Sequence, residues 1–387
     1  MVVKIKDIGE IITGNTPSKK EESYWDSEDI CFVKPDIISD TGISIIEDSN
    51  EYISKNARNR ARVVGKGTVL VTCIGSIGKV GIVSNDESAF NQQINAIVPY
   101  PTVNARYLAY AMIQARPRLE AIANAPVVPI INKTQFGDFQ INIENDVSKQ
   151  EIIVLKLDKL YAIIESRKKE LAKLDELTKA RFVEMFGDPL NGTEKWPLHT
   201  VGDVAESVDP QPSHRTPPVD QDGVPYVSIK DCDYKTGKID FDNARKVGRY
   251  VLDEHRRRYT LHDGDFIIGK IGTIGNPIFV PARDDYTLSA NIVLVQPYRN
   301  KVSPYFLKYS FMSAFMERQF EDAKNSTSQA AFGIQKVRQT SVMNPDLVEQ
   351  YKFEEFAKQV DKSKAEVQKS LDEAQILFDS LMQQYFG

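Results

Sequence analysis

The sequence is poor in residues that bind metals or form disulfides. Its 387 residues include only three cysteines, Cys31, Cys73 and Cys232, and four histidines. The cysteines lie far apart, so their spacing fits no zinc site, and an odd number cannot all pair as disulfides. We therefore expect a reducing compartment and no metal bound by this chain.

Long apolar runs are also missing. No stretch reaches the roughly 18 consecutive apolar residues that a membrane-spanning helix needs. The first residues, MVVKIKDIGE, lack the apolar core of a secretory signal. The shares of hydrophobic residues (41%) and charged residues (27%) are those of a globular protein. We expect a cytoplasmic protein that has no membrane partner.

Familiar catalytic motifs are the third absence. The segment Gly75–Lys79 is too short for a GxxxxGK[ST] phosphate loop, and Val80 follows its lysine. HExxH, GxSxG and the Asn-Pro-Pro-aromatic tetrad of adenine methyltransferases do not occur either. We expect that this chain has no catalytic residue and binds no cofactor of its own.

What the chain does have is a duplication. Met185-Phe186-Gly187 recurs as Tyr385-Phe386-Gly387, and the segment Gly67–Lys79 recurs as Gly264–Asn276. A repeat of this length indicates a duplicated domain rather than a solenoid, whose units run about 20 to 50 residues. The predicted parts are a module, a helix, a linker, a second module and a second helix: 1–147, 148–187, 188–195, 196–345 and 346–387.

Each module is followed by a segment that favours one long helix. Residues 138–186 and 346–386 contain neither glycine nor proline and are rich in helix-forming residues. Two pairs match capping boxes, Ser148 with Glu151 and Asp346 with Glu349. A helix of ~38 residues would be ~57 Å long, longer than a module, so packing on its own module alone is the weaker interpretation.

The apolar residues of both segments recur with the 4-3 spacing of a coiled-coil seam. Because the linker is short, an antiparallel pair is the arrangement of lowest cost. The predicted seam includes Ile153, Leu157, Leu160, Ile164, Leu171, Leu174, Val360, Val367, Leu371, Phe378 and Leu381.

The modules themselves read as mixed α/β. Short apolar runs between glycines predict strands, and a helix is expected after them in each module. Pro117 is expected to end the first of these helices early. The predicted fold class is α+β, with two similar modules separated by an antiparallel coiled coil and related by a pseudo-two-fold axis. The strands are predicted at 68–72, 79–83, 94–98, 265–269, 277–280 and 292–295, and the helices near 105–115 and 303–320.

Charge gives a mixed signal. The net charge of −5 argues against a nucleic-acid binder, but binding needs only a local patch. Basic runs lie at matching places, Lys55–Lys66 and Arg245–Arg258, just upstream of the repeated glycines. One such run is typical of a solvated face, whereas two at matching positions favour phosphate contact, for which arginine is well suited.

Two further features suit a ligand-binding surface. The glycines of Gly75–Gly78 and of Gly272–Gly275 predict tight hairpins. Asn91-Gln92-Gln93 and Ser289-Ala290-Asn291 are expected to expose amides, which can pair with an adenine edge. A polar strand start explains these segments equally well.

Several motifs together resemble the specificity (S) subunit of Type I restriction-modification systems over nearly the whole chain. Gly14-Asn15-Thr16-Pro17-Ser18 is similar to the opening of a target-recognition domain, and Ile30–Ile37 to the strand that follows. Val224–Asp231 is the counterpart in the second module, which departs from the pattern because Asp209–Ser213 lacks the Gly-x-Thr-Pro form. Asn276 also replaces the lysine of the glycine segment.

The resemblance implies a non-catalytic DNA reader whose two modules each recognise half of a split, asymmetric site in double-stranded DNA. It further implies two modification (methyltransferase) subunits that use S-adenosylmethionine, and restriction subunits that use ATP with Mg. A dimeric scaffold that binds proteins, and an enzyme whose site escapes notice, remain the alternatives. The candidate DNA contacts are Thr16, Lys34, Arg58, Arg60, Arg62, Ser76, Lys79, Asn91, Gln92, Lys230, Arg256, Arg257, Arg258, Lys270, Thr273 and Asn291.

Overall fold

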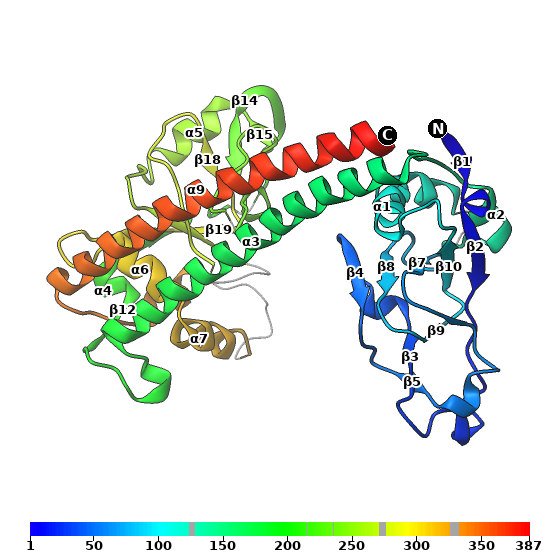
Figure 1. The fold of residues 1–387 in the computed structure, drawn as a ribbon. Helices are drawn as coiled ribbons and strands as arrows, with labels where there is room; N and C mark the ends of the chain where they lie inside the picture. Colours follow the sequence, from blue (N-terminus) through cyan, green and yellow to red (C-terminus); the bar gives the residue numbers. More distant parts are fainter. Residues whose placement is uncertain (124–127, 214, 235, 271–275, 326–332) are drawn as a thin grey trace. The chain divides into compact units, whose positions relative to one another are not determined.

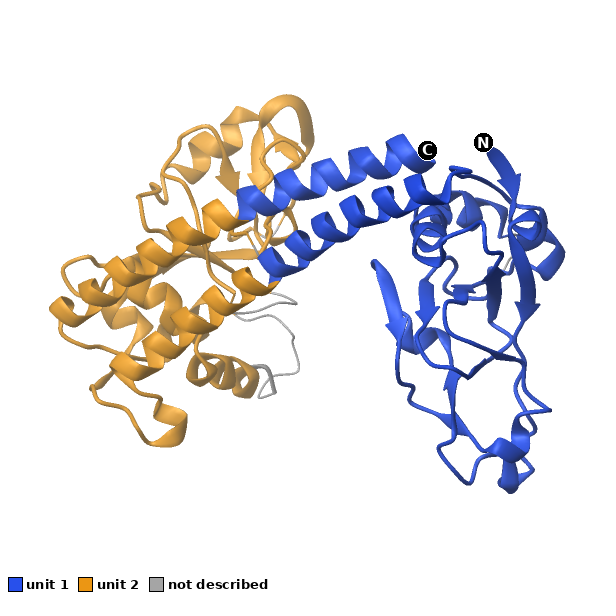
Figure 2. Ribbon diagram, in the orientation of Figure 1, with its two compact units in different colours: residues 1–168, 368–387 blue, residues 169–367 orange. Residues whose placement is uncertain are grey.

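The computed structural model describes residues 1–123, 128–213, 215–234, 236–270, 276–325 and 333–387. The chain divides into two compact units (Figure 2): unit 1 comprises residues 1–168 and 368–387, and unit 2 comprises residues 169–367. Both divisions fall inside helices of 40 residues, α3 (Val147–Phe186) and α9 (Leu347–Phe386) (Figure 1). Each unit therefore contains one module and a part of both long helices.

In the described part of unit 1 the strands form three sheets. The main sheet has the order β2-β10-β7-β8-β4, and it is antiparallel except at its β8–β4 edge. A second sheet has the order β5-β3-β9-β6, and β1 pairs with β11. The elements are β1 (Val2–Lys4), β2 (Gly9–Thr13), β3 (Ile30–Val33), β4 (Ile43–Ile46), β5 (Tyr52–Ile53), β6 (Val63–Val64), β7 (Val69–Thr72), β8 (Val80–Val83), β9 (Ser88–Phe90), β10 (Ile94–Pro99), α1 (Ala105–Ile122), α2 (Lys133–Asp138) and β11 (Gln140–Asn142).

Unit 2 repeats this plan. The order β13-β19-β16-β17 matches β2-β10-β7-β8, the parallel pair β14–β18 matches β3–β9, and β12–β20 matches β1–β11. Two similar mixed α/β modules, predicted from the duplication, are thus confirmed. The elements are β12 (Leu198–Thr200), α4 (Val201–Val204), β13 (Ala205–Val208), β14 (Val219–Val227), β15 (Lys246–Val247), α5 (Arg249–His255), β16 (Phe266–Gly269), β17 (Ile278–Phe279), β18 (Thr287–Leu288), β19 (Ile292–Pro297), α6 (Pro304–Phe311), α7 (Ala314–Asn325), α8 (Ile334–Gln339) and β20 (Ser341–Met343).

Both predicted module helices differ from expectation. Pro117 does not end α1, which continues to Ile122. An internal proline costs about 3 kcal/mol, and the fully buried flanking residues Ala115 and Leu119 offset that cost through packing on the core. The helix expected over 303–320 is two helices, because Ser313 begins a new one by accepting the Met316 N–H at its hydroxyl.

The two long helices run antiparallel within each unit. In unit 1 the rings of Tyr161 and Phe378 lie 6.3 Å apart. In unit 2 the Asp175 carboxylate lies 2.6 Å from the Lys364 ammonium, and α3 residues nearer its C-terminus meet α9 residues nearer its N-terminus. All the predicted seam residues are buried or half-buried, as a seam requires, and Ile153 and Leu157 also belong to the core of the unit 1 module.

The ends of α3 are set by its neighbours in sequence. The carboxylate of Asp146 accepts the Ser148 N–H at 2.9 Å, so α3 begins at Val147 and the capping box expected at Ser148 is wrong. At the other end Gly187 has φ +84°, and a Cβ there would lie 2.0 Å from the Thr193 carbonyl oxygen. Only glycine fits this stop, as the repeated Phe-Gly motif predicted.

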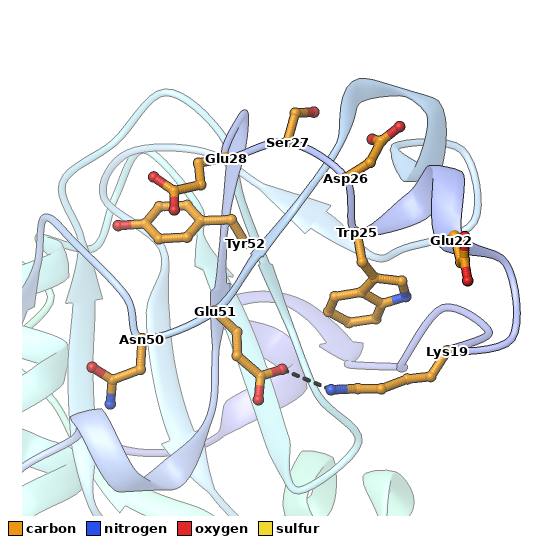
Figure 3. A pocket seen from close by; sticks show the side chains of 9 residues that line it. All are labelled: Lys19, Glu22, Trp25, Asp26, Ser27, Glu28, Asn50, Glu51 and Tyr52. Atoms are coloured by element: carbon orange, nitrogen blue, oxygen red, sulfur yellow. Dashed lines mark hydrogen bonds and ion pairs between the residues drawn. The ribbon is translucent and has the colours of Figure 1, made fainter.

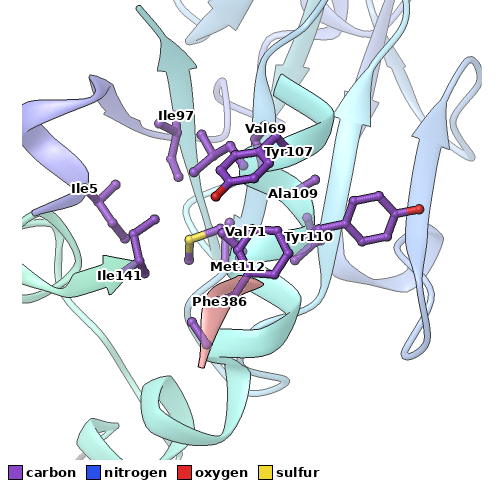
Figure 4. Close-up of a cluster of buried hydrophobic side chains, with 14 of the residues drawn as sticks. Ile5, Val69, Val71, Ile97, Tyr107, Ala109, Tyr110, Met112, Ile141 and Phe386 are labelled. Carbon is purple, nitrogen blue, oxygen red and sulfur yellow. The ribbon is translucent and has the colours of Figure 1, made fainter. Parts of the chain in front are cut away.

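The long helices are anchored in the module cores. In unit 1, α1 packs on β7 and β8, and Phe386 of α9 enters the same core with its ring 4.9 Å from that of Tyr107 (Figure 4). In unit 2, Phe182 and Phe186 of α3 pack against Phe306, with ring centroids 5.5 and 4.7 Å apart. The heptad seam did not include these two phenylalanines, because they face the module.

A buried glutamine repeats the same connection in both units. The Gln150 Oε1 accepts the Asn104 N–H at 2.8 Å, and its Nε2 donates to the carbonyl oxygens of Glu144 and Thr102. The Gln350 Oε1 accepts the Ser303 N–H at 2.7 Å in the same way. Both glutamines are fully buried, so each ties a long helix to the start of its module's helix.

Candidate nucleic-acid interface

A four-residue turn occupies the same place in both units. In unit 1 the turn Asn91–Ile94 joins β9 to β10; Asn91 N–H donates to the Val33 carbonyl and Ile94 N–H to the Asn91 carbonyl. In unit 2 the turn Ser289–Ile292 joins β18 to β19 and makes the corresponding bonds with Val227 and Ser289. The backbone frame is therefore repeated, whereas the side chains on it differ.

The tip of the unit 1 turn is Gln92, which is exposed. The Thr16 hydroxyl, also exposed, donates to the Gln92 Oε1 at 2.8 Å. Asn91 is not exposed, contrary to the prediction: it is 6% accessible, and its amide bonds both the backbone and the side chain of Gln93. Asn91 thus shapes the turn, and Gln92 is the residue that it presents to solvent.

Asn15 brings part of the basic run to the same surface. Its Nδ2 donates to the Arg60 carbonyl and its Oδ1 accepts the Arg62 N–H, both at 2.7 Å. Asn15 also donates its N–H to the Phe90 carbonyl, one residue before the turn. Sequence reasoning did not select Asn15, although the Gly-Asn-Thr-Pro motif contains it.

The cations of the unit 1 basic run are not equivalent. Arg58 donates to the Glu87 carboxylate at 2.7 Å, and this hydrogen bond lowers the pKa of Glu87. Arg60 and Arg62 are exposed, and their guanidinium groups have no partner among the residues that the structure describes. Lys34 is half-buried and paired with Glu51. Arg60 and Arg62 are thus available to a phosphate, as are the exposed Lys55 and Lys66 at the two ends of the run.

The glycine hairpin predicted at Gly75–Gly78 is confirmed, and the one predicted at Gly272–Gly275 lies outside the described residues. Antiparallel β7 and β8 flank the confirmed hairpin, and Gly75 and Gly78 have φ of +76° and +77°. Ser76 is exposed at the tip. Lys79 is not available to contact DNA, because its side chain is 11% accessible and its ammonium lies 3.2 Å from the Asp40 carboxylate.

The corresponding surface of unit 2 has other chemistry. Ala290 stands at the tip of the turn with the exposed Asn291 beside it, and Ala290 N–H donates to the Tyr226 hydroxyl. Lys270 is buried, 2.7 Å from the Asp209 carboxylate, so it has no free surface for DNA. Lys230 is exposed. Thr273 lies outside the described residues.

Two arginines of the second basic run form ion pairs. Arg256 lies 3.3 Å from the Asp284 carboxylate and Arg258 lies 3.4 Å from that of Glu254. Arg257 is exposed, with no ion pair among the described residues. Beside this run, a cavity of about 210 Å³ is lined by the buried His255, whose pKa is lowered by burial.

Unit 1 also has a hollow of about 620 Å³, and its lining is acidic rather than basic (Figure 3). Lys19 lies over the Trp25 ring at 4.6 Å and 3.0 Å from the Glu51 carboxylate. Because carboxylates outnumber its single lysine, this hollow repels phosphate and does not belong to the basic surface. The carboxylates lining it are Glu22, Asp26, Glu28 and Glu51.

Metal sites and membrane-spanning helices are absent from the described residues. They contain no group of three or more His, Cys, Asp or Glu side chains placed to hold a metal ion. No helix in the described part of the chain is both long and apolar enough to cross a membrane.

Both halves of the chain match one known protein family. A model of the Type I restriction modification DNA specificity domain matches residues 1–176 and again residues 193–375. The Type I restriction enzyme MjaIX specificity subunit of Methanocaldococcus jannaschii is 29% identical over 191 residues, 48% of this chain and 44% of that protein. The HindI specificity subunit of Haemophilus influenzae is 27% identical over 181 residues, 46% of this chain and 38% of that protein. The matches therefore span less than half of either relative.

Solved structures show the same fold. The S subunit of a Type I restriction-modification system from M. genitalium covers the whole chain with a TM-score of 0.61 at 12% identity, and 96% of that subunit is covered. A structure described as the basis of complex assembly and conformational transition of the type I R-M system has a TM-score of 0.56 at 15% identity, with 100% and 97% coverage. At such identities the likeness concerns the fold alone.

Proposed function

The chain belongs to the family of the Type I restriction modification DNA specificity domain, and on this premise we propose that it is the DNA-recognition subunit of such a system. Unit 1 reads one half of a bipartite, asymmetric site in double-stranded DNA, and unit 2 reads the other half. Catalysis belongs to partner subunits, which this chain directs to the site.

The observation that carries this proposal is one backbone frame that displays two different surfaces. The turn after β9 and the turn after β18 have matching hydrogen bonds, yet Gln92 stands at one tip and Ala290 at the other. Exposed side chains on a repeated frame suit base readout, because phosphate contacts position a protein whereas contacts to base edges specify the sequence. Unlike surfaces fit unlike half-sites.

The long helices suit a second role, which is to set the unread gap between the half-sites. Each has 40 residues, so each is ~60 Å long at 1.5 Å per residue. The two helices contact each other in both units, through the rings of Tyr161 and Phe378 and through the ion pair of Asp175 with Lys364. A helix pair of this kind resists bending and keeps a fixed length.

The outer faces of the helices supply docking surface for two modification subunits. Within unit 1, Ile152, Leu155 and Ile163 of α3 are 53%, 61% and 44% accessible, and Ile376 and Leu377 of α9 are 70% and 49% accessible. Apolar side chains this exposed on long helices are typical of protein interfaces. The modification subunits bring S-adenosylmethionine for adenine methylation, and restriction subunits bring ATP and Mg.

The DNA-binding part is tested by charge reversal at Arg60 and Arg62 together, in a complex with the modification subunits. Each lost phosphate contact reduces the slope of log affinity against log salt by ~0.9, so the double variant loses ~1.8. Lys149→Glu is the matched control, because Lys149 is an exposed cation of unit 1 beside Gln150, whose side chain bonds Asn104 and Thr102 beyond the end of β10 that is far from the turn. An unchanged salt slope in the double variant, with the complex intact, would favour a protein-binding scaffold instead.

The partner part is tested by Leu155→Glu. The substitution places a charge on the exposed face of α3, and we expect co-purification with the modification subunits to fall while helix content by circular dichroism stays unchanged.

Mapping of methylated adenines in cells with and without the gene then identifies the site. If the two maps were identical, the DNA-recognition proposal would be refuted.

A further inference from the structure

The pair Thr16–Gln92 has the features of a pre-organised reading element. Both side chains are exposed, so neither is needed to fill the core. The Thr16 hydroxyl holds the Gln92 amide at 2.8 Å, and the bonds made by Asn91 fix the turn beneath it. A glutamine restrained in this way loses less conformational freedom when it binds a ligand than a free one does.

The remaining hydrogen-bonding capacity of Gln92 identifies its ligand. An amide oxygen accepts two hydrogen bonds, and the Thr16 hydroxyl takes one of them. One acceptor position and the two Nε2 hydrogens stay free. The adenine edge in the major groove presents an N6–H donor beside the N7 acceptor, which matches a glutamine amide in two hydrogen bonds.

We propose that Gln92, held by Thr16, reads an adenine in the half-site of unit 1. This inference rests on the proposed DNA-recognition function and deepens it by naming the base and the residue that determines specificity. Arg60 and Arg62 supply the neighbouring phosphate contacts, and Asn15 places them there through its two bonds to that segment. Asn15 and Thr16 are positioning residues, whereas Gln92 contacts the base.

Unit 2 cannot make this contact at the same place. The tip residue Ala290 has no polar side-chain atom, and its backbone N–H is bonded to the Tyr226 hydroxyl. The half-site of unit 2 is therefore read by other residues. A change at Gln92 should accordingly alter one half of the site and leave the other half as it was.

The test is a selection from random DNA sequences by the full chain in complex with its modification subunits. Gln92→Ala should reduce the preference for adenine at one position of one half-site by roughly 5- to 150-fold. Thr16→Val should give a smaller loss at that same position. Gln92→Glu keeps the size of the side chain but only accepts hydrogen bonds, so the preference should move toward cytosine, whose N4 donates.

A base analogue makes the test independent of folding. Placing 7-deazaadenine at the affected position removes N7; it should weaken binding of the unsubstituted complex and leave the Gln92→Ala complex unaffected. Equal loss of affinity for all sequences would overturn the inference, because it would make Gln92 a backbone contact. No change at all in Gln92→Ala would overturn it as well. An unsubstituted complex that selects no sequence would overturn the proposed function itself.

Discussion

Replacing the buried glutamine of each unit by methionine tests how the long helices are anchored. Gln150→Met nearly conserves side-chain size and removes three hydrogen bonds, to the Asn104 N–H and to the carbonyls of Glu144 and Thr102. Gln350→Met removes the corresponding bonds in unit 2, including that from the Ser303 N–H. We expect both variants to fold and both to be less stable.

The magnitude follows from the bonds and the burial. Each buried hydrogen bond contributes about 1 kcal/mol net, and a buried N–H left without a partner costs about 1 to 3 kcal/mol. The greater apolar surface of methionine offsets part of this loss. The free energy of unfolding of the affected unit should therefore fall by about 3 kcal/mol. With a urea m-value of about 3 kcal/mol/M, the midpoint should fall by about 1 M.

The chain provides a probe for each unit, because it has two tryptophans, Trp25 in unit 1 and Trp196 in unit 2. In a Trp196→Phe background, fluorescence reports unit 1 and the effect of Gln150→Met. Gln384→Met is the matched control, since Gln384 is exposed on α9 and should change stability by less than about 0.5 kcal/mol. A midpoint shift for Gln150→Met no larger than that of the control would refute the anchoring role.

Three other predictions concern pH, a turn and the helices. Burial lowers the pKa of His255 from its ordinary value of 6.5. Below about pH 6.5, His255 therefore binds a proton in the unfolded state but not in the folded state, and unit 2 should lose up to about 1.4 kcal/mol of stability per pH unit until the folded pKa is reached. The urea midpoint of the His255→Asn variant should lack this pH dependence. An equal pH dependence in the variant would contradict the prediction. Gly42 and Gly67 have φ of +70° and +84°, but only a Cβ at Gly42 would meet a neighbour, the Tyr161 hydroxyl at 2.2 Å. In thermal unfolding, Gly67→Ala should therefore cost about 1 kcal/mol of stability and Gly42→Ala clearly more. Equal losses of stability would mean that Tyr161 moves aside freely. Inserting seven residues into each of α3 and α9 lengthens each helix by ~10 Å and should change the length of the unread gap in methylation maps, while an altered half-site sequence would refute the spacing role.

Periodic features of this chain were predictable, because a helix seam and a glycine turn depend on residues close in sequence. The 4-3 spacing of Leu157, Leu160 and Ile164 required no knowledge of their partners, and all three are buried or half-buried. The stop at Gly187 was equally local, since positive φ favours glycine wherever it occurs. The repeated module followed from the duplication alone.

What failed depended on residues far apart in the chain. Lys270 looked available beside a glycine turn, but Asp209, from a different strand end, pairs with it in the interior. Pro117 looked like a helix stop, but the packing of Ala115 and Leu119 outweighs its missing hydrogen bond. Asn91 was expected to be exposed, but its N–H donates to the Val33 carbonyl of a distant strand and the residue is 6% accessible. Tertiary partners decide such cases, and one sequence does not display them.

The composition of unit 1 constrains the order in which the chain folds during synthesis. Its core contains Met382 and Phe386, which are added long after Tyr107 and the rest of α1. Until those residues emerge, the face of α1 that they cover is open to solvent, and contacts between such distant segments form slowly. Synthesis of unit 1 therefore begins first, and its core is completed last. The growing chain should therefore need protection at that face, and ribosome-bound chains ending at residue 367 should be cut by protease within unit 1 more readily than released full-length chains.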